Sequence, residues 1–282
     1  MADNNLKIML TGITDVGHHR EVNEDGFALC LDAANPDWTL TQTERPATLP
    51  DSGSVIIVAD GMGGAAAGEV ASAIAIETVE QLFDYTTDMP DDMLADAIRR
   101  ADEAINHHVD TAPETTGMGT TIVVAWLRDD QATVAWCGDS RCYRYRPGEG
   151  LMRVSHDHSY VQDLVDMGQI TEDEALTHPE SNIITRCLGD TGTEPEPEVT
   201  RIDLQTDDLL LICSDGLCGY CADSAIEDVL NRYHDDPAVC QEALLQMALD
   251  AGGYDNITIA LAAMVDSPAQ PSGFTRWLKR LF

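Results

Sequence analysis

Short apolar runs in this chain stop abruptly at acidic residues. Residues 55–59 end directly before Asp60, and Leu209–Cys213 is followed, after one serine, by Asp215. Continuous apolar runs of this length predict strands that are buried on both faces. A glycine follows each aspartate, and its permissive backbone allows a sharp turn at the end of the strand.

Other segments carry the periodic patterns of strands and helices. Strands are predicted at residues 122–127, 133–137 and Ile257–Val265, and a polar turn between the first two indicates a hairpin. Apolar positions recur at helical spacing over residues 69–83, 92–108 and 237–251. Strands that pair locally, followed by helices, predict a layered α+β sandwich in which central sheets are covered by helices.

Three segments lack this regularity. Residues 37–53 predict a long loop, and residues 157–188 predict a polar helix-and-loop flap over a site. Residues 267–273 are rich in proline, serine and glycine and predict a linker. We therefore expect one domain over residues 1–266, followed by the linker and a short separate segment at 274–282.

Composition narrows the class of protein. The chain has 282 residues, a mass of 30.6 kDa and 44% hydrophobic residues, enough to bury a sizeable core. No apolar run approaches the roughly 20 residues that span a bilayer, and the N-terminus has too short an apolar stretch for a signal peptide, so we expect a cytoplasmic protein. Eight cysteines without regular spacing fit a reducing compartment. Cys218 and Cys221 have the spacing of a zinc or redox pair, but there is no second pair and we interpret the spacing as coincidence.

The formal net charge of -34, with only Lys7 and Lys279 as lysines, is extreme. Such a surface repels nucleic acid. A metal site uses only a handful of carboxylates, so most of the 50 acidic residues must be solvated. We hypothesise a salty cytoplasm, because salt screens charge within about 3 Å at 1 M. We expect a monomer.

Four acidic blocks, far apart in the chain, occupy equivalent places where apolar runs meet turns. They are Asn23-Glu24-Asp25, Asp60-Gly61-Met62-Gly63-Gly64, Ser214-Asp215-Gly216 and Asp255-Asn256. Alone, each acid could be a turn residue, and Asp60 could be a helix N-cap. Together they predict a cage of oxygen ligands, which favours Mg²⁺ or Mn²⁺ over zinc. Two such ions can hold a phosphate and activate a shared water, so we interpret the pattern as a metal-dependent phosphatase.

Arg20 stands four residues before Glu24. Its planar guanidinium could grip two phosphate oxygens at once. The alternative is a surface ion pair with one of the many nearby acids.

The ordered set of motifs resembles a known family. The set is Asp15-Val16-Gly17, Arg20 to Asp25, Asp60 to Gly64, Gly119-Thr120-Thr121, Gly138-Asp139-Ser140-Arg141, Ser214-Asp215-Gly216 and Asp255 to Thr258. In this order it resembles the metal-dependent protein phosphatases, the PPM family of type 2C Ser/Thr phosphatases, and most of all their bacterial branch. The resemblance covers about residues 15–265.

The resemblance implies a four-layer α/β/β/α sandwich with two antiparallel sheets and two Mn²⁺ or Mg²⁺ ions at one end. By position, Asp60 would bridge both ions and the Gly61 carbonyl would bind one. Asp215 and Asp255 would hold the other ion, and Glu24 and Asp25 would bind directly or through water. Asp139, with Asp215, would offer a third, weaker position, and Arg20 would bind the substrate phosphate. The implied substrate is a phosphorylated protein, such as a target of a Ser/Thr kinase.

One position departs from part of the family. Some members have a histidine where Met62 stands, and that histidine is proposed to protonate the leaving oxygen, which a thioether cannot do. A metal-bound water, His156 and His158 are the remaining candidates for the proton donor.

Two features leave alternatives open. Residues 274–282 combine apolar positions at helical spacing with three basic residues, which predicts either a helix that docks on a partner or membrane or one that packs back on its own acidic domain. The cage also admits a catalytically silent regulatory module that binds phosphoproteins, or a structural calcium-binding protein.

Overall fold

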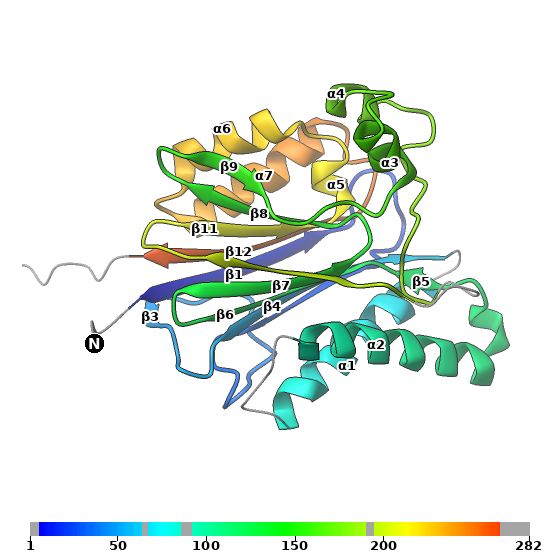
Figure 1. Ribbon diagram of the computed structural model, residues 1–282, viewed down its shortest axis with the longest axis horizontal. Helices are drawn as coiled ribbons and strands as arrows, with labels where there is room; N and C mark the ends of the chain where they lie inside the picture. Colours follow the sequence, from blue (N-terminus) through cyan, green and yellow to red (C-terminus); the bar gives the residue numbers. More distant parts are fainter. Residues whose placement is uncertain (1–5, 64–66, 86–91, 190–194, 266–282) are drawn as a thin grey trace, which may run out of the picture.

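A computed structural model describes residues 6–63, 67–85, 92–189 and 195–265. Two antiparallel sheets of six strands each are stacked face to face, and helices cover the outer face of each sheet (Figure 1). The expected α+β sandwich of four layers is confirmed. The predicted linker and C-terminal segment lie outside the described residues.

The first sheet has the strand order β3-β1-β12-β11-β8-β9. Its strands are β1 (Lys7–Asp15), β3 (Ala47–Thr48), β8 (Arg141–Arg146), β9 (Gly150–Arg153), β11 (Leu209–Cys213) and β12 (Ile257–Val265). The two central strands, β11 and β12, come from the predicted apolar runs. The short strand β3 lies within the predicted loop at 37–53.

The second sheet has the order β10-β7-β6-β4-β2, with β5 paired to the end of β4. Its strands are β2 (Asp25–Cys30), β4 (Ser54–Met62), β5 (Gly119–Thr120), β6 (Ile122–Arg128), β7 (Gln131–Cys137) and β10 (Glu198–Asp203). The predicted hairpin is formed by β6 and β7, and Asp129 takes the positive φ of 56° that the tight turn needs.

The continuous apolar character of β4 follows from its two covered faces. Ile56 and Val58 point into the core between the sheets, whereas Val55, Ile57 and Ala59 point into the core beneath the helices. All five are fully buried. Because side chains alternate along a strand, only a strand covered on both sides shows no polar alternation.

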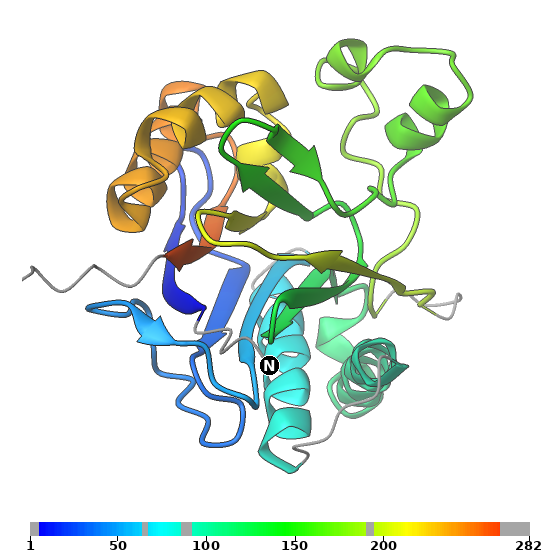
Figure 2. The same cartoon turned by 60° about the vertical axis from the view of Figure 1, so that its left-hand side comes forward.

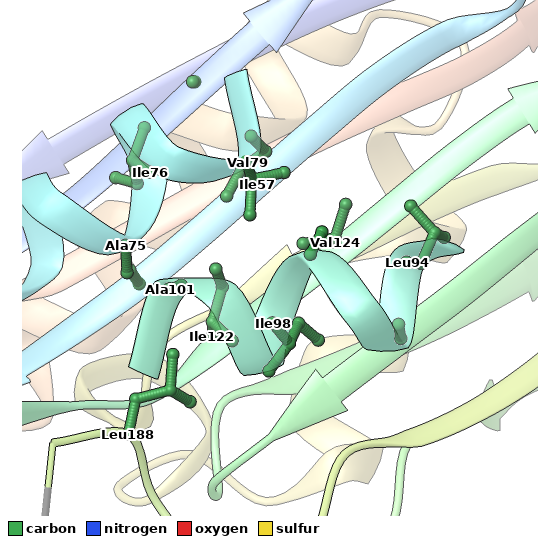
Figure 3. Close-up of a cluster of buried hydrophobic side chains, with 14 of the residues drawn as sticks. Ile57, Ala75, Ile76, Val79, Leu94, Ile98, Ala101, Ile122, Val124 and Leu188 are labelled. Carbon is green, nitrogen blue, oxygen red and sulfur yellow. The ribbon is translucent and has the colours of Figure 1, made fainter. Parts of the chain in front are cut away.

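Two long helices, α1 (Ala67–Tyr85) and α2 (Asp92–Thr111), cover the second sheet. Figure 3 shows Val79 and Ile98 from these helices close to Ile57 and Val124 from the strands. On the first sheet lie α5 (Asp215–Cys218), α6 (Asp223–Tyr233) and α7 (Pro237–Asp250). The three helices predicted from periodicity match α1, α2 and α7 to within a few residues at each end.

The segment 157–188 carries two short helices, α3 (Tyr160–Asp166) and α4 (Glu172–Ala175), which stand apart from the two sheets in both views (Figures 1 and 2). The Ser159 hydroxyl caps α3 by accepting the Gln162 N–H, and Thr171 and Glu174 form a reciprocal capping box on α4. Local hydrogen bonds therefore define α3 and α4 in a segment with little core of its own.

A short 3₁₀ turn, η1 (Pro113–Thr115), follows α2.

No helix in the described part of the chain is long and apolar enough to cross a membrane. All eight cysteines lie within that part, and seven of them are buried. Cys218 and Cys221 pack in the core beneath α5 to α7. The Cys218 thiol also donates to the Ser214 carbonyl over 3.5 Å.

Candidate metal centre

Two of the predicted ligands face each other across neighbouring strands. Asp25 opens β2 and is paired in register with Asp60 near the end of β4. Directly opposite residues of an antiparallel pair project from the same face of the sheet. The strand register therefore brings together two carboxylates that are 35 positions apart.

Three more carboxylates reach the same end of the sandwich from other elements. Asp139 lies in the turn from β7 to β8, where Gly138 adopts a φ of 122°. Asp215 begins α5 and is separated from β11 by Ser214 alone, and Asp255 stands just before β12. Asp25, Asp60, Asp139, Asp215 and Asp255 are named together below as the acid cluster.

Ser214 connects the two sheets at this point. Its hydroxyl donates to Asp25 Oδ2 over 2.7 Å and accepts the N–H of Thr258 over 2.9 Å. One serine thus holds a carboxylate of the second sheet against two strands of the first. Only its place before Asp215 could have indicated this role in the sequence.

The members of the acid cluster influence one another strongly. Burial, followed by the carboxylates of Asp25, Asp215 and Asp139, raises the pKa of Asp60 well above its usual value. Burial and the charges of Asp215 and Asp157 likewise raise the pKa of Asp139.

The same causes act on Asp25 and Asp215. Burial raises the pKa of Asp25 to about 7, and Asp215 and Asp255 add to the shift. Burial, followed by the charge of Asp255, raises the pKa of Asp215 to about 6. Negative charge is therefore concentrated where protein displaces water, and a bound cation would relieve it.

The carboxylate oxygens are held partly by protein donors. In the part of the chain that the structure describes, no group of three or more His, Cys, Asp or Glu side chains is arranged so that it could hold a metal ion as it stands. Asp255 illustrates the reason, because its two oxygens accept hydrogen bonds from Arg20 and from the Asn256 N–H. Repelling carboxylates turn toward whichever donors are near.

The donor set nevertheless fits a hard divalent cation. The buried Oδ1 atoms of Asp139 and Asp215 have no hydrogen-bond partner, and an unpartnered buried carboxylate oxygen is costly unless it meets a charge. Carboxylate oxygens without nitrogen or sulfur ligands are the set that Mg²⁺ and Mn²⁺ prefer.

Glu24 is placed differently from the acid cluster. Its Oε1 accepts the N–H of Gly68 over 3.2 Å, in the first turn of α1. Its backbone carbonyl accepts the N–H of Gly61 and the hydroxyl of Ser72. The side chain therefore caps a helix, where the helix dipole favours a negative charge.

Space around Gly61 admits no side chain. A Cβ there would lie 2.2 Å from the Gly68 carbonyl oxygen and 2.5 Å from that of Glu24. The close approach of three backbone segments, and not a positive φ, requires glycine at this position.

Asn256, which the sequence offered only as part of a motif, organises the loop before Asp25. Its Oδ1 accepts the N–H of Glu24, and its Nδ2 donates to the carbonyls of Val16 and Val22. These three bonds attach residues 16–24 to the start of β12.

Arg20 lies at the edge of the acid cluster. Its Nη2 donates to Asp255 Oδ2 over 2.7 Å, and its side chain is 47% exposed. The ion pair that was the alternative for this residue is therefore formed, and its partner is a member of the acid cluster. A guanidinium has five N–H donors, so this one hydrogen bond leaves others that could bind a ligand.

The candidate proton donors are held elsewhere. His156 Nε2 pairs with Asp166 of α3. His158 is buried, accepts the Gly138 N–H on Nδ1 and faces Glu198 with Nε2. His158 thus supports the turn that carries Asp139 but does not contact the acid cluster, and Met62 pairs with β5.

Comparison with known proteins identifies the family. The family model described as protein phosphatase 2C matches residues 42–250. The chain belongs to this family. The family match agrees with the resemblance carried by the sequence motifs.

Two similar curated relatives are a serine/threonine protein phosphatase and a protein phosphatase of bacteria. The phosphatase PstP of Mycobacterium tuberculosis is 38% identical over 240 residues, which cover 83% of this chain but only 45% of that protein, so the chain spans less than half of its length. The phosphatase PhpP of Streptococcus pneumoniae is 34% identical over 264 residues, which cover 92% of this chain and 98% of that protein.

Solved structures of the family share the fold. The catalytic domain of PstP in complex with two manganese ions has a TM-score of 0.74 and 32% identity, covering 93% of this chain and 100% of that one. The serine/threonine phosphatase of Streptococcus agalactiae has a TM-score of 0.77 and 30% identity, covering 92% and 100%. The two stacked sheets with flanking helices are thus the family's architecture.

Proposed function

We propose that this protein is a metal-dependent protein phosphatase that hydrolyses phosphoserine and phosphothreonine. The observation that carries the proposal is the acid cluster, in which carboxylates from both sheets meet at one end of a protein phosphatase 2C fold. The manganese-bound structure of the PstP catalytic domain supports the same metal chemistry.

The residues have distinct proposed roles toward two Mn²⁺ or Mg²⁺ ions. Asp60 would bridge the ions, the Gly61 carbonyl would serve one, and Asp215 and Asp255 would serve the other. Asp25 would contribute directly or through water. Glu24, which caps α1, would contribute through water only. Asp139, with its unpartnered Oδ1, would add a weaker third position together with Asp215.

When bound, the ions supply a shared water made acidic enough to attack phosphorus, together with positive charge that offsets the phosphate. The chain itself orients the reaction. Arg20 is held at the cluster edge by Asp255, and the remaining donors of its guanidinium are suited to two phosphate oxygens. Ser214 holds the Asp25 carboxylate through its hydroxyl, and Asn256 holds the backbone of the loop that leads to Asp25.

We propose that the leaving oxygen takes its proton from water. The Met62 thioether cannot donate one. His156 and His158 are engaged by Asp166 and by Gly138 and Glu198, away from the acid cluster. We therefore assign no side chain as the general acid.

Hydrolysis of p-nitrophenyl phosphate and of a phosphothreonine peptide, with Mn²⁺ and with chelator, tests the proposal. We expect turnover that depends on the metal and falls at least about a hundredfold in Asp60→Asn and in Asp215→Asn. Asp235→Asn is the matched control, because its side chain is 94% exposed and lies outside the cluster.

Three results would contradict the proposal. Metal binding without any turnover would favour the silent regulatory module, and metal-dependent stability with calcium alone would favour a structural ion. Turnover that survives in both cluster variants would show that the chemistry occurs elsewhere.

A further inference from the structure

A cavity of about 330 Å³ lies beside the acid cluster, between the α3–α4 segment and the start of α6. Asp139 and Asp215, whose Oδ1 atoms have no partner, lie on its wall, so it opens toward the proposed metal centre. Its size is at the lower end of the range for ligand sites, enough for one long side chain rather than a large cofactor.

The positive charges on the wall are already matched. Arg141 makes hydrogen bonds to Asp157 with Nε and Nη2 and approaches Asp223 with Nη1. Arg153 also forms an ion pair with Asp157, although its Nε and Nη2 make no hydrogen bond of good geometry. The two arginines are thus neutralised by Asp157 and Asp223, and they offer little positive charge to a ligand.

The carboxylates of α4 are not matched in this way. Glu172 and Asp173 stand in the first turn of α4, are exposed, line the cavity and form no ion pair with the described residues. The unmatched charge on this side of the cavity is therefore negative.

The remaining wall combines uncharged polar residues with apolar and aromatic side chains. Val161 and Val165 of α3 and Leu176 after α4 supply aliphatic surface. Tyr220, which is 44% exposed and packs on Tyr254 with ring centroids 5.6 Å apart, also lines the cavity. An aromatic face attracts a cation in addition to burying methylene groups.

We propose that this cavity binds a lysine or arginine side chain of the phosphoprotein substrate, near the phosphorylated residue. Such a side chain has an apolar stem and a charged tip, and it matches a wall that carries both aliphatic surface and two carboxylates without an ion-pair partner. The inference rests on the proposed function, and it names the substrate class as phosphoproteins with a basic residue close to the phosphorylation site.

Matched phosphothreonine peptides test this inference. One flanking position at a time carries lysine, its uncharged analogue norleucine, or glutamate, and kcat/KM is measured with Mn²⁺. We expect lysine to exceed norleucine by about fivefold at one or more positions, the size that two partly exposed ion pairs supply. In the double variant Glu172→Gln, Asp173→Asn the ratio should fall to about one.

The ratio of two peptides on the same enzyme cancels any general loss of activity. Asp163→Asn with Glu180→Gln is the matched control, because it removes the same charge from exposed positions of the segment that do not line the cavity. This control should keep the lysine preference.

Three results would overturn the inference. The first is no lysine preference at any position, and the second is a lysine preference that survives in the Glu172 and Asp173 variant. The third is a preference for glutamate, which would mean that the arginines of the cavity bind an acidic side chain. Turnover of p-nitrophenyl phosphate by the wild type separates these failures from failure of the proposed function. If that small substrate is not hydrolysed, the phosphatase proposal itself is wrong.

Discussion

Asn256 offers the sharpest test of how the site is built, because its side chain binds backbone groups only and yet holds the loop that leads to Asp25. Its side chain makes three hydrogen bonds of 2.8 to 3.1 Å to backbone groups of residues 16, 22 and 24. The residue is only 3% exposed. Asn256→Ala removes all three bonds and adds no new group.

The expected cost follows from these bonds. Each contributes about 1 kcal/mol net, and the backbone groups left behind are only partly reached by water, so the free energy of unfolding should fall by about 3 kcal/mol. For a domain of this size that corresponds to a decrease in Tm of roughly 6 to 12 °C. Asn231→Ala is the control, since it removes one bond from Tyr145 at an exposed position and should cost less than about 1 kcal/mol.

Urea unfolding at fixed KCl measures the loss in the free energy of unfolding. Activity as a function of Mn²⁺ concentration measures how far the metal ligands have moved from their places. Loss of the tether should raise the Mn²⁺ concentration for half-maximal activity by about tenfold, the usual effect of removing a residue that orients metal ligands. If Asn256→Ala unfolds within about 1 kcal/mol of the wild type and needs no more Mn²⁺, the tether is not what organises the loop.

Three further predictions concern the rest of the molecule. Asp208 has no exposed side-chain surface and binds Arg146 through both oxygens. Asp208→Asn should therefore cost about 3 kcal/mol in urea unfolding, and a loss below about 1 kcal/mol would refute the importance of this buried pair. Burial lowers the pKa of His158. The stability that its neutral ring contributes is complete above the pH of about 6.5 at which an unfolded histidine titrates, and it is lost as the pH falls. His158→Gln should consequently lose less stability than the wild type between pH 7 and pH 5, and equal losses would contradict this reasoning. Finally, the net charge of -34 predicts that Tm rises as KCl increases from low to molar concentration; a flat or falling Tm would reject the high-salt hypothesis.

Some elements could be predicted because their signal is local. The apolar runs at β4 and β11 are continuous because both faces of each strand are buried, and α1, α2 and α7 show helical spacing because one face of each packs on a sheet. Strand β8 was not predicted. Its sequence contains three arginines, and two of them pair with Asp157 and Asp208, which are 16 and 62 positions away. Edge strand β10 alternates between half-buried and exposed residues, so it too carries little apolar signal.

The sequence by itself predicted the acids of the candidate site: positions where apolar runs meet turns indicated Asp25, Asp60, Asp215 and Asp255, and the family resemblance added Asp139. Only the tertiary structure decided how they are arranged. It placed Asp25 opposite Asp60, turned Glu24 toward α1, and used Ser214 to join the sheets. These outcomes depend on strand register and on contacts between residues up to 189 positions apart, as between Ser214 and Asp25. A hydrogen bond across such a separation depends on the packing of the whole domain, and no local pattern records it.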